Sequence, residues 1–105
     1  PDKDIAEKWA ERYSLDNIFD YIDLPGPYGI YEISPIQEWV GKSIRESNIA
    51  ARYKVSILGI RKNEGEEMHI MPSADYVIQE KEHLMVMAHN DVAARLLEPR
   101  KKRKK

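Results

Sequence analysis

The sequence lacks several features on which whole classes of protein depend. It contains no cysteine, which excludes a disulfide framework and a thiolate metal site and is compatible with a cytosolic location. No apolar run approaches the roughly 20 residues of a membrane-spanning helix. The five glycines form no phosphate-binding loop, and no serine has the sequence context of a catalytic nucleophile. We therefore expect a protein without enzymatic activity.

Metal binding through histidine is not expected either. The three histidines, His69, His83 and His89, are widely spaced and do not form the paired spacing of a helical metal motif. Alternation within the predicted strands places His69 and His89 at the solvent side or at a sheet edge. We expect no metal ion and no cofactor in this stretch of chain.

Charge is distributed unevenly along the 105 residues. The net charge is -1, but the last six residues are all basic, and without them 11 basic and 18 acidic residues remain, a net charge of -7. An acidic body of this kind repels nucleic acid and anionic lipid. We expect residues 99–105 to be a solvated, disordered tail, and contact between this tail and nucleic acid or anionic lipid is the alternative.

The first part of the chain is predicted to be helical. Ile5, Trp9 and Tyr13 recur at helical spacing over residues 2–14, which gives this helix an apolar face. Such a face needs a partner surface, either the sheet of the same chain or a neighbouring chain or domain. Asp16 is expected to cap a second short helix over residues 17–22, which the prolines and glycine of residues 24–27 end.

The rest of the chain alternates between strand and helix patterns. Residues 28–34 alternate with period two and predict a strand that Pro35 ends. Trp39 follows in a loop and is expected to cover the sheet. Ser43 has Glu46 three residues later, the spacing of a capping box, so a helix is expected to begin there.

Three further strands and a final helix complete the predicted domain. Residues 55–60 and 68–71 predict two strands joined by a hairpin turn at residues 63–66, and Pro72 ends the second. Residues 84–89 predict a strand apolar enough to be covered on both faces. Asn90 or Asp91 is expected to cap the last helix. The predicted fold class is α+β, a small mixed or antiparallel sheet with flanking helices.

The order of these motifs resembles one family of regulatory domains. The stretches that carry the resemblance are residues 20–24, 28–33, 39–46, 48–53, 55–61, 72–75 and 80–87. Together they resemble the RCK_C (TrkA-C) domain of KtrA-type regulatory subunits of bacterial potassium-uptake systems. The resemblance covers about residues 16–98, and residues 1–13 resemble the last helix of the RCK_N domain that precedes it in this family.

The resemblance implies a domain division and a function. Residues 1–27 would be the end of an RCK_N domain and a crossover linker, residues 28–98 the RCK_C domain, and residues 99–105 the basic tail. Such domains are cytoplasmic gating modules that form homodimers within a ring beneath a membrane potassium channel or transporter, at the inner face of the plasma membrane. In many members the cleft of the dimer binds the dinucleotide cyclic di-AMP.

Positions in the family pattern identify the residues that would line this cleft. Apolar side chains would pack on the adenine rings, while short polar groups would meet the base edges. Several family members carry an arginine that binds the phosphates where this sequence has Ala50, and Arg52 lies nearby. The implied cleft residues are Ile44, Asn48, Ile49, Ala50, Arg52, Ser56, Ile57 and Pro72.

Other interpretations of the same residues stay open. The three isoleucines could be core or dimer-interface residues alone, Asn48 could be only a helix interruption, and Pro72 only a strand terminator. The domain could also be the dimerisation element of an antiporter or exchanger that binds no small ligand. A nucleic-acid-binding module that uses the basic tail is the remaining class.

Overall fold

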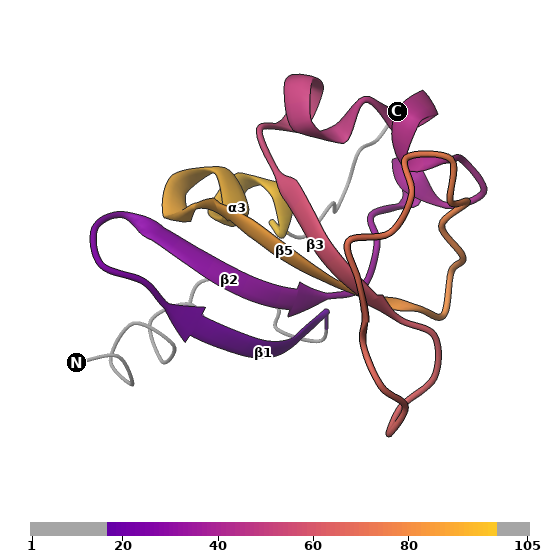
Figure 1. Cartoon of the computed structure of the whole chain (residues 1–105). Coiled ribbons are helices and arrows are strands. Elements are labelled where there is room, and N and C mark those ends of the chain that lie inside the picture. The colour runs from indigo at the N-terminus through magenta and orange to yellow at the C-terminus, as the bar shows by residue number, and fades with distance from the viewer. Residues whose placement is uncertain (1–16, 99–105) are drawn as a thin grey trace.

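A computed structural model of the chain describes residues 17–98 (Figure 1). The predicted helix over residues 2–14 and the basic tail therefore lie outside the described residues. The elements are β1 (Ile18–Asp23), β2 (Tyr28–Ile33), η1 (Gln37–Trp39), α2 (Ile44–Ser47), η2 (Ile49–Tyr53), β3 (Ser56–Arg61), β4 (His69–Ile70), β5 (His83–His89) and α3 (Asn90–Leu96). Within residues 17–98, no helix is long and apolar enough to cross a membrane.

The five strands form one antiparallel sheet in the order β1-β2-β5-β3-β4. The predicted strands β2, β3 and β5 are confirmed, and β4 is shorter than expected, with only two residues. In Figure 1 the helix α3 lies across one face of β5. The sheet thus has one face covered by helices and loops.

The helix predicted over residues 17–22 is wrong, because Ile18–Asp23 forms the edge strand β1. Tyr21 of β1 pairs with Tyr31 of β2, and their rings lie 4.9 Å apart. Aromatic and β-branched side chains favour a strand when a neighbouring strand is available. The segment is too short for its periodicity to distinguish a helix from a strand. Pairing with β2 therefore determines that it is a strand.

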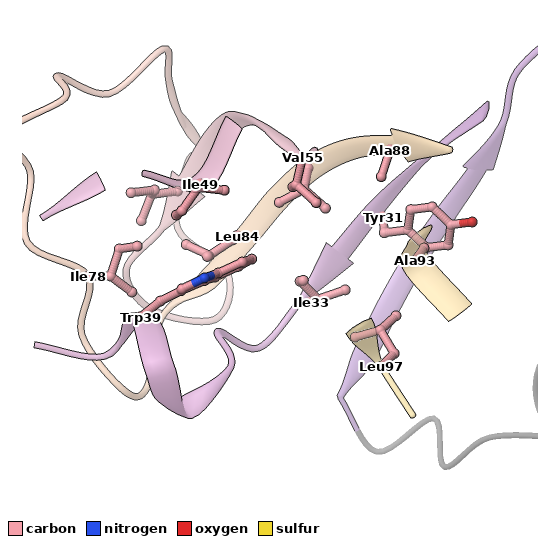
Figure 2. Close-up of a cluster of buried hydrophobic side chains, with 12 residues drawn as sticks. Tyr31, Ile33, Trp39, Ile49, Val55, Ile78, Leu84, Ala88, Ala93 and Leu97 are labelled. Atoms are coloured by element: carbon pink, nitrogen blue, oxygen red, sulfur yellow. The ribbon is translucent and has the colours of Figure 1, made fainter. Parts of the chain in front are cut away.

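The hydrophobic core lies between the sheet and the segments that cover it (Figure 2). Trp39 is completely buried, as predicted, and lies beside Leu84 and Ile78. The strand β5 was expected to be covered on both faces, and this is wrong. Leu84, Val86 and Ala88 are buried, whereas Met87 on the opposite face is 36% exposed, because β5 has a covering layer on one side only.

Side-chain caps mark the residues at which the helices α2 and α3 begin. Ser43 and Glu46 form the predicted capping box, with both hydrogen bonds at 2.9 Å. The predicted cap of the last helix is wrong by one or two positions. His89 caps α3, since its Nδ1 accepts a hydrogen bond of 3.0 Å from the backbone N–H of Asp91.

Candidate functional site

The predicted cleft residues come from four consecutive parts of the fold. Ile44 lies in α2, Asn48 lies at the end of α2, three residues lie in η2, two begin β3, and Pro72 follows β4. Asn48 has a left-handed backbone (φ 52°) and ends α2, so the expected interruption at this residue is confirmed. Lys54, also left-handed at φ 63°, ends η2 before β3 begins.

Backbone hydrogen bonds tie α2 to the loop before β5. The N–H of Ile44 donates to the carbonyl of Tyr76 at 3.0 Å, and the N–H of Arg45 donates to the carbonyl of Ala74 at 2.7 Å. On the other side, the N–H of Met71 donates to the carbonyl of Leu58 in β3 at 2.8 Å. The segment after β4 therefore connects α2 with β3, and Pro72 lies within this connection.

The eight residues differ in how far they are open to solvent. Asn48, Ala50, Arg52 and Ser56 are exposed, and Pro72 is half-buried. Ile44 and Ile57 are half-buried and pack against the core, whereas Ile49 is only 2% exposed and belongs to the core itself. The structure thus offers small and polar groups at the surface with two isoleucines beneath them.

The segment that carries these residues has an excess of positive charge. Residues 44–54 contain Arg45, Arg52 and Lys54 against the single acid Glu46. Arg45 forms an exposed ion pair with Asp75 at 3.0 Å, and the guanidinium of Arg52 lies 5.5 Å from the ring centre of Tyr53. A cationic segment on an otherwise acidic body favours an anionic ligand at this place. Sequence reasoning missed Arg45 and Lys54.

Tyr76 fixes the loop to which α2 is bonded. Its hydroxyl donates a hydrogen bond to the carboxylate of Glu82, which is buried and also accepts from the N–H of Gln79 at 2.9 Å. Burial, and then the bond to Glu82, raise the pKa of Tyr76 to about 12. The tyrosine therefore stays protonated at neutral pH and remains a donor.

Exposed apolar side chains lie next to the same connection. Met71 is 81% exposed with a left-handed backbone (φ 56°), and its neighbour Ile70 is 59% exposed. Val77, which pairs with Ser43 at the start of α2, is also exposed. A methionine in this backbone conformation is uncommon, and exposed apolar groups at a surface of this kind are typical of an interaction site.

A cluster of polar side chains lies on the face of the sheet opposite the hydrophobic core. The carboxylate of Glu32, 7% exposed, accepts from Arg61 Nε at 2.9 Å and contacts His83 Nδ1 at 3.0 Å. Phe19 stacks on His83 with ring centres 3.7 Å apart. The bond from Arg61, more than any other interaction, holds the pKa of Glu32 below its usual range. These residues come from four strands, and the sequence alone did not indicate the cluster.

The described residues offer no metal site. Among residues 17–98, no group of three histidine or carboxylate side chains could hold a metal ion. The residues near α2 offer apolar packing, hydrogen bonding from amides and hydroxyls, and attraction of anions by arginine and lysine.

The chain is similar to one known domain family and to two potassium-uptake proteins. The TrkA-C domain model matches residues 30–99. Ktr system potassium uptake protein A of Bacillus subtilis (strain 168) is 35% identical over 89 residues, which is 85% of this chain and 39% of that protein. Ktr system potassium uptake protein C of the same organism is 28% identical over 87 residues, 83% of this chain and 38% of that protein. The chain thus spans less than half of either relative.

Solved structures show the same fold. The RCK_C domain dimer of S. agalactiae BusR in complex with c-di-AMP is 34% identical, with a TM-score of 0.55 over 68% of this chain and 88% of that chain. The RCK C domain of the potassium transport protein KtrA in complex with c-di-AMP is 19% identical, with a TM-score of 0.55 over 91% of this chain and 95% of that chain. At 19% identity, the second likeness shows the fold alone.

Proposed function

The chain belongs to the TrkA-C (RCK_C) domain family, and we propose from this that it is the regulatory domain of a subunit that gates a membrane potassium channel or transporter. It acts as a homodimer and senses cyclic di-AMP in the cleft between two copies. The domain is cytoplasmic and reaches the inner face of the plasma membrane through its transporter partner. Residues 1–27, of which Ile18–Asp23 form the edge strand β1 of this sheet, join it to an RCK_N domain of the same full-length protein.

One observation carries the ligand assignment. The BusR domain, 34% identical to this chain, was solved as a dimer in complex with c-di-AMP, and the match covers 88% of that domain. The residues that the resemblance implies for the cleft belong to α2, η2 and the start of β3, with Pro72 after β4. Both the identity and the placement support a dinucleotide site made by two copies of this surface.

The chemistry of the surface fits such a ligand. Two-fold symmetry allows one symmetric dinucleotide to meet the same groups of both copies. Each adenine would lie against the apolar groups Ile44, Ile57 and Pro72, while Asn48 and the groups near Ser56 offer hydrogen bonds to the base edges. The cationic segment 44–54 would attract the phosphates.

Ala50 sets the expected strength of binding. It is exposed on η2, so an arginine here could reach solvent and an anion without disturbing the core. Without that arginine the phosphates depend on backbone amides and on Arg52. The loss of one charge-assisted contact costs about 1–3 kcal/mol. We therefore propose that binding is weaker than in members that have the arginine.

Isothermal titration with cyclic di-AMP tests the assignment. Ala50→Arg should tighten binding and Ala50→Glu should weaken it, and neither substitution touches the core. Ile57→Asp should abolish binding while circular dichroism still shows a folded domain, and Ile22→Asp at an exposed position of β1 should leave binding unchanged. If neither the wild type nor Ala50→Arg binds at high micromolar concentration, the ligand assignment is wrong.

A second candidate is a dimerisation element that binds no small ligand. The exposed apolar side chains of Ile70, Met71 and Val77 favour it, because they offer a contact surface whether or not a ligand is present. This candidate predicts a dimer whose stability does not change with any cyclic dinucleotide. We do not propose nucleic acid as a partner.

A further inference from the structure

Pro72 follows a hairpin arm, defined here as residues 62–71. The arm leaves β3 after Arg61, extends away from the sheet and returns as β4 (Figure 1). The strand β4 has two residues, and two residue pairs join it to β3. So short a pairing holds an edge strand weakly. The position of the arm therefore depends on side-chain contacts as well as on the pairing of the strands.

Arg61, the last residue of β3, contacts the arm and the sheet at the same time. Its Nη1 donates a hydrogen bond to the backbone carbonyl of Glu66, inside the arm. Its Nε donates to the carboxylate of Glu32 on β2 at 2.9 Å, and its Nη2 donates to the same carboxylate at 3.4 Å. A guanidinium is planar and its donors point in fixed directions. The buried carboxylate thus orients Arg61 so that Nη1 points at the arm.

The carboxylate of Glu32 is itself held by a second strand. The strand β5 lies between β2 and β3, and its residue His83 is the direct partner of Arg61 across the sheet. His83 Nδ1 lies 3.0 Å from Oε2 of Glu32, the oxygen that also accepts from Arg61 Nε. Contacts of one carboxylate with two neighbours fix its rotamer, and the network is more rigid than a single ion pair.

The arm also lies close to the backbone of β3. A Cβ added at Gly59 would lie 2.8 Å from Met68 Cγ and 3.1 Å from the backbone carbonyl oxygen of His69. A glycine at this position therefore permits an approach that any other residue would block. At the end of the arm, the N–H of Met71 donates to the carbonyl of Leu58 at 2.8 Å.

We propose that Arg61 is a positioning residue for the candidate ligand surface, because with Glu32 as its fixed partner it holds the arm on β3 and thereby sets the place of Pro72. Lysine could not replace it, since one ammonium group cannot reach the Glu32 carboxylate and the Glu66 carbonyl in these two directions. The part of Pro72 in ligand binding rests on the proposed function. The placement of the arm by Arg61 does not.

Amide hydrogen exchange on the whole chain without ligand, followed by NMR at one protein concentration, tests the placement of the arm. The reporter is the N–H of Met71, which donates to β3. Arg61→Lys keeps the charge but loses the planar donor set, so it should speed this exchange several-fold. Glu32→Gln should have a smaller effect of the same kind, and the double variant should exchange no faster than Arg61→Lys alone. Unchanged exchange in Arg61→Lys would overturn the proposal.

Two further variants separate release of the arm from a general loss of stability. Tyr31→Phe removes a hydrogen bond of 2.8 Å to Asn90, on the core side of the sheet, and should leave the exchange of the Met71 amide close to that of the wild type. Gly59→Ala pushes on the backbone of the arm without touching the ion pair and should speed the exchange. If Tyr31→Phe speeds it as much as Arg61→Lys does, the arm follows the stability of the whole domain and Arg61 has no positioning role.

Titration calorimetry with cyclic di-AMP measures the consequence for the ligand surface. Arg61→Lys should weaken binding several-fold while light scattering gives an unchanged mass, and Tyr31→Phe should bind as the wild type does. If Arg61→Lys releases the arm but binds as tightly as the wild type, Arg61 does not position the ligand surface, and the proposed function stands without it. If the wild type itself does not bind, the proposed function is wrong, and the exchange of the Met71 amide alone decides whether Arg61 positions the arm.

Discussion

Substitution of Ser43 tests how the candidate ligand surface is held in place. Its side-chain oxygen accepts from the N–H of Glu46, and the Glu46 carboxylate accepts from the N–H of Ser43, both at 2.9 Å. Ser43 is buried, so Ser43→Ala removes the bond to the N–H of Glu46 at a position where Ser43 packs against the rest of the domain. The loss of such a cap costs about 1 kcal/mol of stability. For a domain of this size, that is about 4–8 °C in melting temperature.

Thermal unfolding followed by circular dichroism, at one fixed protein concentration, measures this loss. Ser73→Ala is the matched control, because Ser73 also accepts a backbone bond, from Asp75 at 3.1 Å, but in an exposed turn. We expect it to lower the melting temperature by far less. Glu46→Ala should add little to Ser43→Ala, since the two bonds form one box.

Equal shifts of the melting temperature in Ser43→Ala and Ser73→Ala would contradict a stabilising role of the Ser43 cap. Ser43→Ala should also weaken cyclic di-AMP binding, because α2 positions Ile44 and Asn48 at the proposed cleft. A Ser43→Thr variant, which can still accept the bond without adding charge, should restore both stability and binding. If Ser43→Thr restored stability but not binding, the cap would not be what positions the binding residues.

Three further predictions concern charge, assembly and the tail. The pKa of Glu32 is lowered by Arg61 and His83, so its stabilising effect is present at neutral pH and is lost as the pH falls through the folded-state pKa. The melting temperature of Glu32→Gln should therefore fall less steeply on acidification than that of the wild type, and equal slopes would contradict this. Light scattering at tens of micromolar should give twice the chain mass of 12.3 kDa; a single-chain mass would exclude the dimer. Truncation after Pro99 should keep cooperative unfolding, because residues 100–105 add no apolar area, and a non-cooperative melt would show otherwise.

Much of the fold was predictable because the local sequence patterns agree with the way the side chains pack in the core. The strands β2, β3 and β5 follow from alternation, and the Ser43 cap follows from spacing alone. The strand β1 was not predictable in this way. Its residues Ile18–Asp23 fit a short helix as well as a strand, and only pairing with β2 decides between them. A partner strand supplies information that no local window contains.

Part of the candidate site could likewise be predicted from the sequence, and part of it could not. The family pattern indicated Ile49 as a cleft residue, whereas it lies in the core at 2% exposure; a core position was the alternative that the sequence left open for the three isoleucines. Met71 was not predicted as a surface group, because its exposure follows from a left-handed backbone held by the bond to Leu58. The cluster of Glu32 depends on the register of separate strands, which the sequence does not contain.

The stoichiometry of cyclic di-AMP binding tests the central claim most directly. A cleft formed by two copies of the surface around α2 and β3 binds one symmetric dinucleotide per two chains. Titration calorimetry with cyclic di-AMP, on a sample whose dimeric mass has been confirmed by light scattering, should therefore saturate at one ligand per dimer, while cyclic di-GMP produces no comparable heat. Saturation at one ligand per chain, or no binding by either the wild type or Ala50→Arg, would contradict the account.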